Sequence, residues 1–262
     1  MGAPDTAAAW FPYPAGPADA TSPLLFCLHH GGGGASAYRD WQRLLGPAVE
    51  IVPVQLPGRE GRLAEPAERS IAALTERLAG PLLERAGGRP YAFFGHSMGA
   101  LLAYDLSHAL TAAGRPPAHL AVSGYLPPHV RPAGSVHTLP EEEFLAHVAG
   151  LEGTPAVILE NPTLLELVLP VLRDDFTACE TYTYTERGPL EVPVAVFTGD
   201  ADPGAPADMA ARWGELTAAG ATVDVFPGGH FYLQDRLPEL LDALRNRLPM
   251  FAAASTDGGG GR

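Results

Sequence analysis

The chain has 262 residues, 46% of them hydrophobic and 18% charged, which suits one large globular domain or two small ones. Its net charge of −13 argues against nucleic acid or an anionic membrane as the main partner. All 17 basic residues are arginine. A Walker-type phosphate loop and Schiff-base chemistry both need lysine and are therefore excluded.

Short apolar segments alternate with segments of helical periodicity along the chain. Strands are expected at Leu24–Leu28, Ile51–Gln55, Tyr91–Phe94, Leu120–Ser123, Val192–Thr198 and Thr222–Phe226. Helices are expected at Ala37–Leu45, Ile71–Arg85, Met98–Ala113, Ala207–Ala219 and Pro238–Leu248. This alternation predicts an α/β fold with a mostly parallel central sheet, flanked by helices and joined by right-handed crossovers.

The connection between the fourth and fifth expected strands is much longer than a crossover helix requires. It contains two helical segments, Glu141–Ala149 and Thr163–Tyr182, and Pro170 should kink or split the second. The apolar stripe of the second segment fits plain core packing or a lid over the sheet. We favour a helical lid insertion at about residues 125–190, because long insertions tend to be functional.

The two ends of the chain and its two cysteines indicate the domain range, the location and the redox chemistry to expect. Residues 1–253 are expected to form a single domain, and the low-complexity residues 254–262 a disordered tail. No secretory pattern and no apolar run of bilayer length is present, so we expect a cytoplasmic location and no membrane partner. Cys27 and Cys179 indicate neither a disulfide framework nor a metal site.

The segment from Tyr91 to Leu106 carries the strongest motif. An apolar strand runs into Gly95-His96-Ser97-Met98-Gly99, and an amphipathic helix begins at once. This is G-x-S-x-G between a strand and a helix, where a sharp turn lifts the serine hydroxyl above the sheet. Ser97 is the candidate nucleophile, and the Met98 amide at the helix start can bind developing negative charge.

A serine nucleophile needs a base and a residue that orients the base. His230 follows the last expected strand and comes directly after Gly228 and Gly229, which suits a side chain presented from a tight loop. We assign it as the base. Asp200 and Asp202 both follow the preceding strand. Asp202 precedes Pro203, which holds it extended, so we favour Asp202 as the orienting acid and Asp200 as a loop cap.

Four consecutive glycines, Gly31 to Gly34, follow the first expected strand and the pair His29-His30. Gly32 to Ala37 fit a dinucleotide fingerprint, but the second strand ends at Gln55 without the acid that would bind a ribose. Neighbouring histidines in a strand point in opposite directions, and no third ligand is evident, which argues against a metal. The remaining interpretation is a loop that supplies one N–H donor of an oxyanion hole.

These stretches resemble the α/β-hydrolase fold, and more narrowly the type II thioesterases that accompany polyketide and nonribosomal peptide synthases. The matching segments, which run nearly end to end, are "WFPYP", "CLHHGGGGASAY", "VQLPGREGRLAEP", "FFGHSMGALLAYDL", "LPVLRDDFTACETYTY", "VFTGDADP" and "PGGHFYL". The family usually has Pro-His-Ala-Gly-Gly in the first loop, so the resemblance assigns Gly31 as the second oxyanion donor. The family's acid precedes the proline of its "DP" pair, which matches Asp202.

The resemblance implies a serine thioesterase without cofactors that hydrolyses acyl groups from the phosphopantetheine arm of acyl or peptidyl carrier proteins. Such an enzyme removes aberrant or stalled acyl groups. Carrier proteins are typically acidic, as this chain is, so docking needs a local basic patch, and Arg59 and Arg62 are the candidates for carrier or phosphate contact. An arginine that is merely solvated or internally paired is an equal alternative at these positions. A product-releasing thioesterase, a general carboxylesterase and a non-catalytic binding protein remain as alternatives.

Overall fold

The computed structural model describes residues 7–14, 16, 21–130, 134–151 and 161–253. Within these residues, six strands form one sheet in the order β2-β1-β3-β4-β5-β6, and every neighbouring pair is parallel. The strands are β1 (Leu24–Leu28), β2 (Glu50–Pro53), β3 (Tyr91–His96), β4 (His119–Ser123), β5 (Val194–Gly199) and β6 (Ala221–Phe226). The predicted mostly parallel sheet is confirmed.

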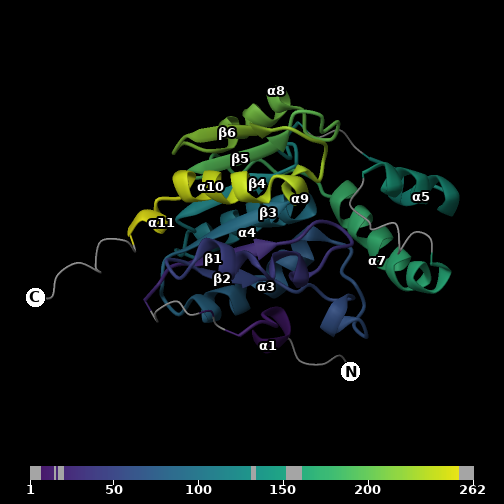
Figure 1. Ribbon diagram of the computed structural model, residues 1–262, viewed down its shortest axis with the longest axis horizontal. Coiled ribbons are helices and arrows are strands. Elements are labelled where there is room, and N and C mark those ends of the chain that lie inside the picture. Colours follow the sequence, from purple (N-terminus) through teal and green to yellow (C-terminus); the bar gives the residue numbers. More distant parts are fainter. Residues whose placement is uncertain (1–6, 15, 17–20, 131–133, 152–160, 254–262) are drawn as a thin grey trace, which may run out of the picture.

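Helices cover both faces of the sheet (Figure 1). The α-helices are α1 (Ala7–Trp10), α2 (Trp41–Leu45), α3 (Ile71–Ala86), α4 (Met98–Ala112), α5 (Glu141–Gly150), α7 (Pro162–Glu180), α8 (Ala207–Ala210), α9 (Tyr232–Asp235), α10 (Leu237–Arg247) and α11 (Met250–Ala253). Four short 3-10 helices are described as well: η1 (Ala35–Tyr38), η2 (Glu60–Arg62), η3 (Val136–Thr138) and η4 (Ala211–Leu216). In this described part of the chain, no helix is both long and apolar enough to cross a bilayer.

Alternation along the strands divides the core into two layers. In β1, Leu24, Phe26 and Leu28 pack in the cluster that contains α3 and α4, while Leu25 and Cys27 pack in the cluster that contains α10. Successive side chains of a strand point to opposite faces, so a strand buried on both faces is apolar throughout. The central strands therefore lie in a rigid frame that holds the loops at their carboxyl ends.

Several elements differ from their predicted bounds. The segment predicted as one helix at Ala37–Leu45 is divided into η1 and α2, and the segment Ala207–Ala219 into α8 and η4. Strand β5 begins only at Val194, after a proline that has no N–H to donate to the sheet. Helix α7 continues through Pro170, so the helix is not split there, while a kink stays a prediction. This proline is exposed, so water can bind the carbonyl it leaves unpaired.

The long connection between β4 and β5 holds η3, α5 and α7, which lie together at one end of the sheet (Figure 1). These elements share a small apolar cluster of their own, centred on Phe144, Val148 and Leu172. Residues 131–133 and 152–160 of this connection lie outside the described residues, as does the expected tail at 254–262.

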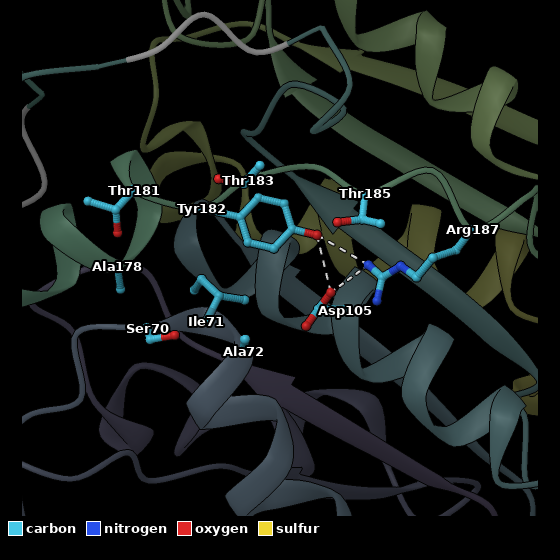
Figure 2. Close-up of a pocket in the computed structure, with 10 residues that line it drawn as sticks. All are labelled: Ser70, Ile71, Ala72, Asp105, Ala178, Thr181, Tyr182, Thr183, Thr185 and Arg187. Carbon is cyan, nitrogen blue, oxygen red and sulfur yellow. Dashed lines mark hydrogen bonds and ion pairs between the residues drawn. The ribbon is translucent and has the colours of Figure 1, made fainter.

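The chain that follows α7 is tied to α4 by polar contacts (Figure 2). Asp105 of α4 accepts hydrogen bonds from Tyr182 at 3.1 Å and from Arg187 at 2.5 Å, and its other oxygen accepts one from Thr75 of α3 at 3.0 Å. Asp105, Tyr182 and Arg187 border a cavity of about 440 Å³ that is lined by none of the predicted catalytic residues. The contacts anchor the carboxyl end of the long connection to the core.

Candidate active site

Ser97 stands between β3 and α4 with φ +54°, a positive value that non-glycine residues rarely adopt. The turn is possible because two backbone segments approach closely at the flanking glycines. A Cβ on Gly95 would overlap the carbonyl of Gly99, and a Cβ on Gly99 would overlap the carbonyl of Leu28. The strained backbone, typically worth about 1–3 kcal/mol, is held by the surrounding strands and presents the hydroxyl at the sheet edge.

His230 and Asp202 reach Ser97 from two other strand ends. Nε2 of His230 lies 3.0 Å from the Ser97 Oγ, and Nδ1 lies 2.9 Å from Oδ2 of Asp202. Asp202 is only 3% exposed, and its Oδ1 also accepts the Gly204 amide at 2.8 Å. The acid is therefore fixed in orientation, and it can hold the imidazole in the tautomer that accepts the serine proton.

Asp200 has a different partner. Its Oδ1 accepts the Gly228 amide at 2.9 Å and so joins the loops that follow β5 and β6. The residue is exposed, and it makes no contact with the imidazole of His230 among the described interactions. The structure thus brings Asp202, and not Asp200, against the candidate base.

The two predicted oxyanion donors border the same small cavity as Ser97 and His230. Gly31 and Met98 line this space of about 160 Å³ together with residues of α7, among them Phe176 and Cys179. Met98 begins α4, where the helix dipole favours negative charge. The arrangement can bind a small acyl group beside a nucleophile, a base and two backbone amides.

Aromatic rings surround His230, the candidate base. The ring centroid of His96 lies 5.1 Å from that of His230, and Phe231 makes edge contacts with His30, His96 and His230. Burial, followed by the charge of His230, lowers the pKa of His30 to about 4 and that of His96 well below its usual value. The neighbouring histidines are therefore kept neutral around the base.

Arg59 and Arg62 do not present free guanidinium groups. Arg59 forms a two-point ion pair with Asp175, and Arg62 pairs with Glu65 and stacks on the Trp10 ring. Both arginines are buried. Contact of either residue with a carrier protein stays a prediction, and such contact would require breaking these internal pairs.

Two sets of residues near the site were missed from sequence. Asp175 of α7 lies against the glycine-rich loop, but its partners are remote in sequence. Ser123, at the end of β4, bonds both Nδ1 of His96 at 3.0 Å and the hydroxyl of Tyr232 at 2.8 Å. The position of Ser123 at a strand end could have pointed to it, whereas nothing in the local pattern of α7 singles out Asp175. Within the described residues, no group of three or more His, Cys, Asp or Glu is placed to hold a metal ion.

Comparison with known proteins places this geometry in a family. The thioesterase domain model matches residues 23–248. The chain is 38% identical over 233 residues to the thioesterase PikA5 of Streptomyces venezuelae, covering 88% of this chain and 83% of that protein. It is equally 38% identical over 233 residues to a protein named linear gramicidin dehydrogenase LgrE of Brevibacillus parabrevis, covering 87% of this chain and 88% of that one.

A solved structure agrees in both sequence and shape. The type II thioesterase BorB from the borrelidin biosynthetic cluster superposes with a TM-score of 0.81 at 37% identity, covering 88% of this chain and 95% of that one. This similarity confirms the predicted α/β-hydrolase fold. The chain belongs to the thioesterase domain family, and it is a hydrolase that acts on thioesters.

Proposed function

We propose that the chain hydrolyses acyl thioesters on the phosphopantetheine arm of acyl or peptidyl carrier proteins, and so removes aberrant or stalled acyl groups in polyketide or nonribosomal peptide biosynthesis. The observation that carries this proposal is the unbroken hydrogen-bonded path from Asp202 through His230 to Ser97. BorB and PikA5, which are named as thioesterases, support the reaction class.

Acylation begins when the Ser97 Oγ attacks the carbonyl carbon of the thioester and its proton passes to Nε2 of His230. Asp202 stabilises the imidazolium that forms. The oxyanion lies against the amides of Gly31 and Met98, and each such donor typically contributes about 2.7–4 kcal/mol to transition-state stabilisation. Collapse of the tetrahedral intermediate breaks the carbon–sulfur bond, and His230 returns its proton to the pantetheine sulfur.

Deacylation repeats these steps with water as the nucleophile. His230 takes a proton from water as the water oxygen bonds to the acyl carbon, and the same two amides bind the second oxyanion. Breakage of the bond to the Ser97 Oγ then releases a carboxylic acid, while His230 returns the proton to the serine. The neutral state of His96 supports both halves, because a fixed positive charge beside His230 would oppose its protonation.

The connection between β4 and β5 serves as the lid in this proposal. Helix α7 contributes Asp175, Phe176 and Cys179 to the wall of the catalytic cavity, whereas the triad comes from loops at the strand ends. A cavity of about 160 Å³ suits a short acyl group better than a completed peptide or polyketide chain. This size favours editing over product release.

The experiment presents carrier proteins loaded with acetyl, propionyl and longer acyl groups to the wild-type chain and to Ser97→Ala. Wild type should release the free acid from short acyl groups, and Ser97→Ala should lose this activity. Ser107→Ala is the matched control, since Ser107 is a buried serine on the same helix that only donates to the Ala103 carbonyl. It should retain wild-type rates.

The alternatives give different outcomes in the same assay. Hydrolysis of simple esters without hydrolysis of carrier-bound thioesters would instead identify a carboxylesterase. A preference for long, nearly complete chains would identify a product-releasing enzyme. If no acyl ester or thioester is hydrolysed, the result would favour a non-catalytic binding protein with this fold.

A further inference from the structure

Asp175 is a buried acid of α7 whose carboxylate meets two loops at once. It is 1% exposed. Its Oδ2 accepts the Gly32 amide at 2.7 Å and the Arg59 Nη1 at 2.6 Å, while its Oδ1 accepts Arg59 Nη2 at 2.9 Å. Gly32 belongs to the loop after β1 and Arg59 to the loop after β2, so this one side chain joins α7 to both.

The loop that Asp175 holds is the one that carries the Gly31 amide. The Gly32 N–H belongs to the peptide unit directly after Gly31, so a bond to it restricts how the Gly31 backbone can turn. The loop is also closed by a bond from the Gly33 amide to the His30 carbonyl at 3.0 Å. A carboxylate on this peptide therefore acts on the orientation of the preceding amide.

The glycine-rich loop and α7 are also in direct van der Waals contact. Gly32 has φ +76°, and a Cβ there would overlap the side chain of Leu172, one turn before Asp175 on α7. A Cβ on Gly31 would lie 3.4 Å from the Asp175 Cβ. Glycine lets the loop lie directly on the helix, and Gly31 to Gly34 have no side chains to hold them there. The residue after them is held from the side of β2, where the Ala35 amide donates to Oε1 of Gln55 at 3.1 Å. The position of the glycines on the helix therefore depends on what α7 presents.

Stability alone does not account for the buried ion pair between Arg59 and Asp175. Removing two charges from water offsets most of their attraction, and buried pairs often stabilise no more than apolar residues of similar size. A second buried acid allows a direct comparison. Glu50 pairs with Arg85 and Arg89 at the start of β2, away from the catalytic cavity, and makes no contact with the glycine-rich loop among the described interactions.

We infer that Asp175 is a positioning residue for catalysis: it fixes the glycine-rich loop so that the Gly31 amide faces the substrate carbonyl oxygen. The inference rests on the proposed function for the role of Gly31 as a donor. The donor is then in place only while α7 is seated on the loop. Binding at the lid and stabilisation of the oxyanion become one coupled event, with Arg59 holding the Asp175 carboxylate in the required direction.

The test measures how fast a fluorophosphonate labels Ser97. In this reaction the Ser97 oxygen bonds to phosphorus, fluoride leaves, and the phosphoryl oxygen occupies the place of the oxyanion. Asp175→Ala, which removes the acceptor of the Gly32 amide, should lower the labelling rate constant by about 10²-fold, the usual effect of losing one oxyanion donor. Arg59→Lys, which keeps the charge but not the two-point contact, should give a smaller decrease. Hydrolysis should show a lower kcat with little change in KM.

A loss of stability and a misplaced donor change different quantities in the labelling experiment, and a control variant separates them further. Unfolded molecules lower the final amount of label, whereas misplacement of the donor lowers the rate constant of the molecules that do react. Glu50→Gln removes a buried acid with two arginine partners, and it should lower the free energy of unfolding while its labelling rate constant stays at the wild-type value.

Wild-type labelling rate constants in both Asp175→Ala and Arg59→Lys would overturn the inference, as would an equal decrease in Glu50→Gln. The proposed function is judged separately. A wild-type chain that labels at Ser97 but leaves acyl carrier proteins intact would contradict the proposed substrate, and the comparison of labelling rates would still decide the role of Asp175.

Discussion

The Asp202 carboxylate and the His230 imidazole meet from loops that follow two adjacent strands, with Oδ2 2.9 Å from Nδ1. Asp202→Asn should therefore lower kcat by about 10⁴-fold, because an amide no longer enforces the productive histidine tautomer. Asp200→Asn should retain near wild-type kcat, since an asparagine oxygen can still accept the Gly228 amide. Steady-state hydrolysis by the two variants checks this, and loss of turnover in Asp200→Asn alone would reverse the assignment.

The close approach at the nucleophile turn predicts opposite effects for two glycine-to-alanine changes. Gly99→Ala should lower the free energy of unfolding by at least about 1–3 kcal/mol, because its methyl group overlaps the rigid carbonyl of Leu28. Gly80→Ala, at an exposed position of α3 with open space around it, should raise it by about 0.5–1 kcal/mol. Urea denaturation measures both, and equal effects would contradict the overlap.

Acid should destabilise the fold through partly buried histidines. Burial, and then the charge of Arg187, lowers the pKa of His108 to about 4, against an ordinary value of 6.5; Asp105 opposes this shift. Between these two pH values the unfolded chain binds more protons than the folded one, so stability decreases as the pH falls from about 6.5 toward 4. His30 shifts in the same direction.

The measurement is the free energy of unfolding at pH 7.5 and at pH 5, for wild type and for His108→Gln. Wild type should be less stable at pH 5, and the variant should show a smaller difference between the two values. An unchanged difference in His108→Gln would show that this histidine does not contribute to the acid sensitivity.

The contact between Arg187 and Asp105 should stabilise the fold without taking part in catalysis. Arg187→Met leaves the buried Asp105 carboxylate without its cation, and we expect the free energy of unfolding to fall by about 1–3 kcal/mol. Thioester hydrolysis at 25 °C should be unaffected. Arg212→Met, which breaks a solvent-exposed ion pair with Glu215, should have a smaller effect. Thermal or urea unfolding of the two variants measures this difference in stability.

The three residues of the candidate triad could be predicted from sequence because each lies next to a recognisable strand end. Ser97 sits in a strand–turn–helix motif, and apolar strands precede both Asp202 and His230. Carboxyl ends of parallel strands meet at one edge of a sheet, which brings these side chains together. The choice between the two aspartates rested on a proline and on the resemblance, since spacing alone does not say which carboxylate turns inward.

Contacts between distant segments were beyond sequence reasoning. The sequence predicts Arg59 in a docking patch because an acidic carrier protein needs a local basic surface on this acidic chain, but a buried partner on α7 pairs with its guanidinium. Nothing in the apolar periodicity of α7 distinguishes Asp175 from the neighbouring Asp174. The division of the segment Ala37–Leu45 into η1 and α2 depends likewise on tertiary packing, which periodicity does not record.

The order of the strands has a consequence for synthesis of the protein on the ribosome. His230 follows β6, which is the last of the described strands along the chain and an edge of the sheet that pairs only with β5 among them. A growing chain therefore contains the serine turn before it contains the proposed base. We expect a chain that terminates before β6 to hold Ser97 without the histidine that the proposal assigns to activate it, and so to be inactive.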